Sequence, residues 1–143
     1  ADNHAILGAL HLEEQRRRAA NLPAHPLPHV VSSVVEHPAI VECLVSLESA
    51  GRLRVTNVGV DGDGRVSASE VAAAVCEDTI LVTIMHSNNE VGALQPVDEI
   101  VKLVRGGSVK CDVLIHTDAA QSVGKVALDV RLMGVDMLTM VGH

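Results

Sequence analysis

The chain has 143 residues, of which 48% are hydrophobic and 20% are charged, so the sequence predicts one globular domain with a substantial core rather than a disordered segment. A formal net charge of −7 and the complete lack of Phe, Trp and Tyr argue against nucleic-acid binding, which relies on basic surfaces and aromatic stacking. No apolar run approaches the ~20 residues of a membrane span, so we expect no membrane partner. The three cysteines have no paired spacing, so we expect reduced thiols in a cytoplasmic protein.

The first part of the chain alternates between helical and extended patterns. Apolar residues at helical spacing predict a helix over 3–19, and a proline-rich loop follows at 21–28. The β-branched segment 29–35 predicts a strand. Pro38 then opens a second helix, which Gly51 ends.

The middle of the chain continues this alternation. Segment 52–60 alternates apolar and polar residues and predicts a strand, and an Asp-Gly-Asp-Gly turn follows at 61–64. Ser67 predicts a helix N-cap, because Glu70 stands three residues later in a capping-box pattern. Segment 79–85 is an almost unbroken apolar run, which is typical of a strand buried on both faces of a parallel sheet.

The last third adds one more helix and two short strands. After a polar loop at 87–95, Pro96 starts a helix that Gly106 ends. Segments 113–115 and 137–141 predict strands. The alternation predicts an α/β fold with a mainly parallel sheet and helices on both faces, and no linker indicates a second domain.

Polar residues gather where the predicted strands end. They are Glu36 and His37, Ser87 to Glu90, His116 to Asp118, and Gly142 and His143. Ligands of such sheets bind beyond the carboxyl ends of the strands. A single polar residue there is commonly a turn former, but four groups at equivalent ends favour one shared site.

One segment imitates a calcium site. Residues 59–70 resemble an EF-hand loop, with Asp61, Asp63 and Glu70 at liganding places. However, the first liganding place holds Gly59, and the preceding segment alternates like a strand instead of forming a helix. A strand, a turn and a capped helix account for the same residues.

A zinc site has even less support. His25 and His29 have i, i+4 spacing, but Pro26 and Pro28 exclude a helix there. No cysteine pair accompanies the two histidines, so we expect no metal.

Five segments carry a family resemblance. They are Ala-Asp-Asn-His-Ala-Ile-Leu-Gly at 1–8, Ser-Val-Val-Glu-His-Pro-Ala at 33–39, Ser-Asn-Asn-Glu-Val-Gly at 87–92, His-Thr-Asp-Ala-Ala-Gln-Ser-Val-Gly-Lys at 116–125 and Val-Gly-His at 141–143. In order and spacing they resemble the cysteine desulfurases and selenocysteine lyases of the class V aminotransferase group. The resemblance implies that residues 1–143 are part of the large domain that binds pyridoxal 5'-phosphate, with both ends truncated.

The resemblance also implies a role for each site residue. Asp118 would lie beside the ring nitrogen of the cofactor, and Gln121 would donate to its phenolic oxygen. Asn89 would hold that oxygen or the substrate carboxylate, and His143 would contact the phosphate. His37 would stack on the ring and relay protons, so His37 and Asp118 are the expected catalytic residues.

The implied reaction removes sulfur or selenium from L-cysteine or L-selenocysteine and leaves L-alanine. The family's cofactor-binding lysine directly follows His143 and its nucleophilic cysteine lies further on, so the chain by itself is expected to be inactive. Val141 replaces a hydroxyl residue common in desulfurases, which slightly favours the lyase. Another class V aminotransferase or lyase, or a non-catalytic paralogue, remains open.

The resemblance further implies a homodimer, and a sulfur- or selenium-acceptor protein is a possible partner. A mitochondrial or plastid location of the parent protein also remains open.

Overall fold

The computed structural model describes residues 2–88, 90, 92–109 and 112–141. Within these residues five parallel strands form one sheet of order β2-β1-β3-β4-β5. The strands are β1 (His29–Ser33), β2 (Arg54–Val58), β3 (Thr79–Thr83), β4 (Leu114–Asp118) and β5 (Met137–Thr139). The helices are α1 (Asp2–Ala19), α2 (Pro38–Ser49), α3 (Ala68–Ala74), α4 (Val97–Arg105) and α5 (Val130–Met133).

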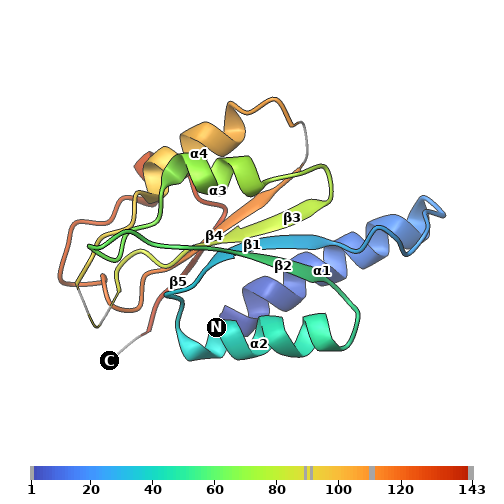
Figure 1. Ribbon diagram of the computed structural model, residues 1–143, viewed down its shortest axis with the longest axis horizontal. Coiled ribbons are helices and arrows are strands. Elements are labelled where there is room, and N and C mark those ends of the chain that lie inside the picture. The colour runs from blue at the N-terminus through green and yellow to red at the C-terminus, as the bar shows by residue number, and fades with distance from the viewer. Residues whose placement is uncertain (1, 89, 91, 110–111, 142–143) are drawn as a thin grey trace.

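Helices cover both faces of the sheet, which confirms the predicted α/β class. Helices α1 and α2 pack on one face, and α3 and α4 pack on the other (Figure 1). Each face has its own apolar core: Leu10, Val30 and Leu81 belong to the α1–α2 side, and Val82 and Ile115 to the α3–α4 side. Successive strand residues therefore contribute to opposite cores, which explains the unbroken apolar run of β3.

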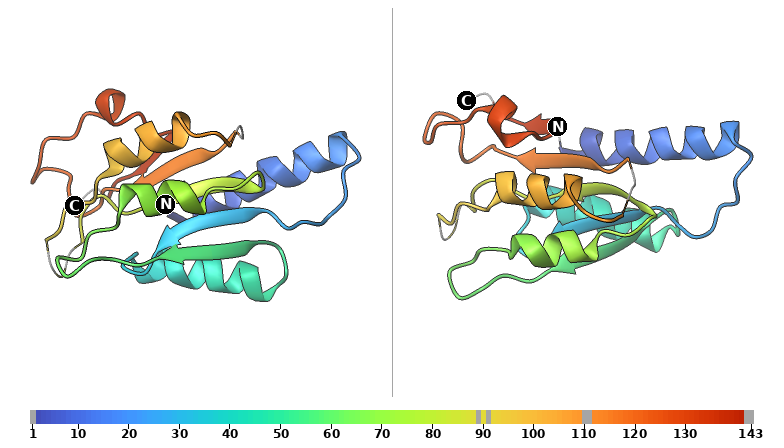
Figure 2. Two further views of the ribbon diagram at one scale, coloured as in Figure 1. Left: turned by 45° about the horizontal axis from the view of Figure 1, so that its top comes forward. Right: turned by 90° about the horizontal axis from the view of Figure 1, so that it is seen from above.

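The order of the strands reverses direction between β1 and β3. The chain moves from β1 outward to β2 through α2, and then returns past β1 to β3 through α3. The connecting helices change faces at the same point, as the turned views show (Figure 2). In doubly wound sheets this switch point, at the carboxyl ends of the strands, is where ligands bind.

The strands predicted at 29–35, 52–60, 79–85 and 137–141 are present but shorter, and two further elements differ more from the sequence-based expectation. Strand β4 does not end at Ile115 but continues through Asp118, because His116 and Thr117 find hydrogen-bond partners inside the sheet. The short helix α5 was not predicted; Asp129 caps it and Gly134, at φ 71°, ends it. Its four residues are too few to show a helical period in the sequence.

The cap at Ser67 is a local feature that the structure confirms. Its Oγ accepts a hydrogen bond from the backbone N–H of Glu70 at 3.4 Å, at the start of α3. We expect Ser67→Ala to lower the free energy of unfolding by about 1 kcal/mol, because an orphan donor of the first turn loses its partner. Urea denaturation measures this, with the exposed Ser46→Ala in α2 as control; equal losses in both variants would contradict the cap.

Candidate functional site

Asp118 is the last residue of β4, an interior strand of the sheet between β3 and β5. Its side chain is only 6% exposed, and Oδ1 accepts a hydrogen bond from the N–H of Ala120 at 2.9 Å. Its carbonyl oxygen accepts from the N–H of His86 at 2.8 Å, which ties the strand end to the segment that follows β3. The Ala120 N–H therefore holds the carboxylate, and the His86 N–H holds the backbone that carries it.

His37 caps the N-terminus of α2 beyond the end of β1. Its Nδ1 accepts a hydrogen bond from the N–H of Ala39 at 3.1 Å, and Pro38 occupies the first helical position, where a missing N–H costs nothing. Because Nδ1 acts as acceptor, the neutral imidazole carries its proton on Nε2. His37 is exposed, so a ligand can contact its ring.

Gln121 follows β4 and lies at the same edge of the sheet. Its Oε1 accepts from Nζ of Lys125 at 3.3 Å. Asp118 thus ends a strand, and His37 and Gln121 follow strands. The strands are parallel, so their carboxyl ends lie at the same end of the sheet. Asn89 and His143 lie outside the described residues, so convergence of all five residues on one cleft stays a prediction.

Glu36 is a buried acid that the sequence placed among the strand-end polar groups but to which it assigned no role. Burial raises its pKa from 4.5 to about 7, and the negative charges of Asp118 and Asp2 add to this rise, against hydrogen bonds from Ser33 and from the N–H of Met85. The sequence signal that could have identified it as a site residue was its position between a buried strand and His37. A raised carboxyl pKa is common at functional sites.

His116 lies inside the sheet and not in the strand-end site for which the sequence made it a candidate. Its Nδ1 lies 2.8 Å from Thr83 Oγ1 and its Nε2 lies 2.9 Å from Thr139 Oγ1, so the ring links β3, β4 and β5. Burial lowers its pKa, although nearby Asp2 and Asp118 oppose the shift. A neutral imidazole that bonds both threonines belongs to the sheet interior.

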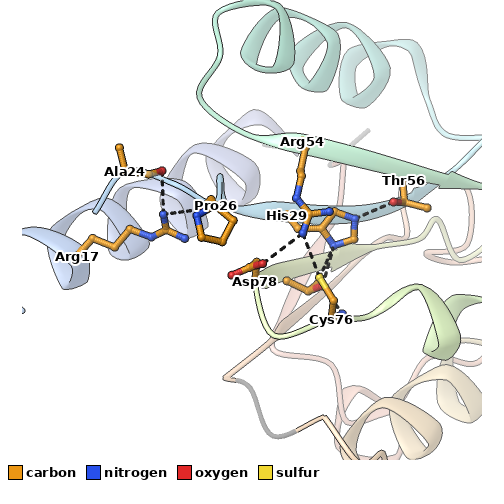
Figure 3. Close-up of polar contacts among 9 residues, drawn as sticks. Arg17, Ala24, Pro26, His29, Arg54, Thr56, Cys76 and Asp78 are labelled. Carbon is orange, nitrogen blue, oxygen red and sulfur yellow. Dashed lines mark hydrogen bonds and ion pairs between the residues drawn. The ribbon is translucent and has the colours of Figure 1, made fainter. Parts of the chain in front are cut away.

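A second polar cluster lies at the opposite end of the sheet, where the parallel strands begin (Figure 3). His29 places Nδ1 2.7 Å from Thr79 Oγ1 and Nε2 2.7 Å from Thr56 Oγ1. Both ring nitrogens are thus engaged by threonines, which removes the basis for a His25–His29 zinc pair. A cavity of about 450 Å³ at this end of the sheet is lined by α1 and by residues at and just before the starts of β3 and β4.

The thiol of Cys76 belongs to this second polar cluster. Arg54 Nη2 lies 3.3 Å from its Sγ and the Thr79 hydroxyl 3.5 Å. Burial acts to raise the pKa of Cys76, but hydrogen bonds from Thr79, the Asp78 N–H and Arg54 outweigh it and lower the pKa. Burial alone raises the pKa of Cys43.

We expect iodoacetamide to alkylate Cys76 faster than Cys43 at pH 8, because the thiolate is the reactive form. Site-resolved mass spectrometry of the folded protein measures both rates. Arg54→Ala is expected to slow Cys76, whereas Arg52→Ala, which removes an exposed arginine bonded to Glu14, is expected to leave it unchanged. Equal rates at Cys76 and Cys43 would contradict the assignment.

The calcium-like segment is a turn between a strand and a helix, as the sequence favoured. Strand β2 precedes it in place of an entering helix. Asp61 Oδ1 accepts from the backbone N–H groups of Asp63 and Arg65 at 2.9 and 3.0 Å, so this carboxylate closes the turn.

Across the described ranges no helix is long and apolar enough to cross a membrane.

Comparison with known proteins assigns the chain to a family. The aminotransferase class-V family matches residues 18–143. A protein named cysteine desulfurase IscS from Vibrio vulnificus strain YJ016 is 37% identical over all 143 residues, and a putative cysteine desulfurase IscS 1 from Bacillus subtilis strain 168 is also 37% identical over the whole chain. The chain covers 32% and 34% of their lengths, about one third.

Solved structures show the same relationship. One described as SspA in complex with cysteine superposes with a TM-score of 0.81 at 33% identity, over 99% of this chain and 37% of that one. Another, described as a NifS-like protein, gives a TM-score of 0.81 at 31% identity, over 98% of this chain and 35% of that one. Both the sequence match and the parallel sheet agree: this chain belongs to the aminotransferase class-V family.

Proposed function

We propose that residues 1–143 are part of the pyridoxal-phosphate-binding large domain of a cysteine desulfurase, which removes sulfur from L-cysteine and leaves L-alanine. The observation that carries this proposal is Asp118, a buried carboxylate held at the carboxyl end of a central strand in a class V chain. His37 and Gln121 follow strands that end at the same edge.

The residues at this edge fit pyridoxal 5'-phosphate chemically. A carboxylate such as Asp118 is the acceptor that a protonated pyridine nitrogen requires. Gln121 supplies an amide donor for the phenolic oxygen, and His37 supplies a flat ring with a proton on Nε2. Since the chain has no Phe, Trp or Tyr, His37 is the natural partner for the face of an aromatic ring. Asn89 and His143 complete the proposed set.

Each of these residues has a distinct task in the proposed reaction. The cofactor, when bound, supplies an electron sink for the substrate's Cα, provided that its ring nitrogen stays protonated. Asp118 holds the proton at that nitrogen through a charge-assisted hydrogen bond. His37 orients the ring and relays protons through Nε2.

The substrate is the finer part of the proposal. The solved relative described with cysteine and the relatives named cysteine desulfurases favour sulfur. Selenocysteine is the second candidate, favoured by Val141 where many desulfurases carry a hydroxyl residue. The same proposal includes a homodimer, a sulfur- or selenium-acceptor protein and a cytoplasmic location.

The test is to incubate the full-length protein with the cofactor, a thiol reductant and L-cysteine, and to measure alanine and sulfide together. Equal amounts of both products are expected, and parallel reactions with L-selenocysteine give the preference between the two substrates. Visible absorbance of the purified protein reports cofactor loading. Amino transfer to a 2-oxo acid without sulfide release would replace the desulfurase by another class V activity, and absent loading would overturn the proposal.

A further inference from the structure

Glu36 joins the two strands that flank the switch point of the sheet. It follows β1, and its Oε1 accepts a hydrogen bond from the Ser33 hydroxyl at 2.5 Å and another from the N–H of Met85 at 3.0 Å. Met85 lies beyond the end of β3, 49 positions away in the chain. With 7% of its surface exposed, the side chain makes this connection in the interior.

Further contacts extend this connection to Asp118. Asn88 Nδ2 donates to the carbonyl of Val35 at 3.3 Å, next to Glu36, so the turn after β1 is held to the segment after β3 at two points. The N–H of His86 donates to the carbonyl of Asp118 at 2.8 Å. A continuous path therefore runs from the turn that carries His37, through Glu36 and Met85, to the end of β4.

The second carboxyl oxygen of Glu36 has a different environment. Oε2 is fully buried and has no hydrogen-bond partner in the described structure. The ionisable groups that act on Glu36 from neighbouring elements are Asp118 of β4 and Asp2 of α1, both acidic. An ionised carboxylate is costly beside two other acids and away from water, so a neutral carboxyl is favoured.

We propose that Glu36 is a positioning residue for the cofactor site, whose carboxyl group fixes the His37 turn relative to Asp118. This inference rests on the proposed function, because it assigns Asp118 to the ring nitrogen and His37 to the ring face of one cofactor. Without Oε1 the turn loses its hydrogen bond to the N–H of Met85, one of the two points that hold it to the segment after β3, while the Asn88–Val35 hydrogen bond remains. His37, the next residue, then moves with the turn, while Asp118 stays on its strand.

The test uses the full-length protein and measures the dissociation constant of pyridoxal phosphate at pH 6. Glu36→Ala is expected to weaken binding by roughly tenfold or more, the usual scale for residues that orient direct ligands. Glu36→Gln keeps a carbonyl oxygen for both donors and is expected to bind close to wild type. Glu42→Ala, which removes an exposed acid from α2, is the matched control and is expected to change nothing.

A second readout separates positioning from a general loss of stability. Circular dichroism in the cofactor's visible band reports how the ring is seated, and all variants are measured well below their unfolding temperatures. Glu36→Ala is expected to change this signal, and Glu36→Gln to restore it. If Glu36→Ala does not fold, Ser33→Ala, which removes one donor to Oε1, is expected to shift the signal and the affinity in the same direction.

The outcomes distinguish this inference from the function on which it rests. Wild type that binds no cofactor overturns the proposed function. Wild type that binds, with unchanged affinity and dichroism in Glu36→Ala, or in Ser33→Ala where the former does not fold, overturns only the role of Glu36. Glu36→Gln as defective as Glu36→Ala overturns the bridging role of Oε1.

Discussion

Asp118→Asn is expected to lower alanine release by the full-length enzyme by about 10²–10³-fold, or ~3–4 kcal/mol of transition-state stabilisation, while cofactor still loads. Asn has nearly the size of Asp and retains an oxygen that can accept from the N–H of Ala120, so the turn after β4 should survive. It cannot supply the negative charge that holds a proton at the ring nitrogen. The substitution therefore acts on turnover far more than on binding.

Visible absorbance confirms loading of the Asp118→Asn variant, and alanine release then gives its turnover. Asp63→Asn is a suitable control, because Asp63 is an exposed acid in the turn after β2. Near-normal alanine release by a fully loaded Asp118→Asn enzyme would remove Asp118 as the partner of the ring nitrogen. The role assigned to the strand end at 116–121 would then be withdrawn.

The second large effect concerns stability and comes from the buried acid Glu36. Its pKa is raised from 4.5 in the unfolded chain to about 7 in the folded protein. Below pH 4.5 both states hold the proton, and the contribution of Glu36 is fully present. Between these values only the folded state holds it, so stability falls as pH rises; above about 7 the loss is complete. At roughly 1.4 kcal/mol per pKa unit, the loss is about 3 kcal/mol.

Glu36→Gln should remove this dependence, because the amide does not ionise. We expect the free energy of unfolding of the variant, relative to wild type, to rise by about 2.5 kcal/mol between pH 5 and pH 8, because a small part of the loss already occurs below pH 5. Urea denaturation at each pH measures the difference. The comparison between proteins is needed because burial lowers the pKa values of His29, His86 and His116, and these groups make stability rise with pH.

Glu42→Gln, at an exposed position of α2, is the control and should follow wild type at every pH. Parallel curves for wild type and Glu36→Gln would show that Glu36 ionises in the folded protein as it does in the unfolded chain. In that case Oε2 would have access to water or a partner that the described contacts do not include.

The sequence by itself determined the features that depend on near neighbours. The unbroken apolar run predicted β3, because a strand covered on both faces needs apolar residues at every position. Ser67 predicted a helix start, because a cap is a contact over three residues. The motifs around His37 and Asp118 predicted a family, and the family match confirms it.

Only the tertiary structure decided how distant segments meet. The sequence predicted that this strand ends at Ile115, before the polar string that starts at His116. Thr83 and Thr139, 33 and 23 positions away, form the hydrogen bonds with His116 that allow its burial. The sequence grouped Glu36 with His37 at the end of a strand but did not indicate that its pKa is raised. Its raised pKa depends on removal from water and on Asp118, brought close by a strand order that chain order does not reveal. Local patterns fix which segments are strands, whereas desolvation and charge depend on what packs around each side chain.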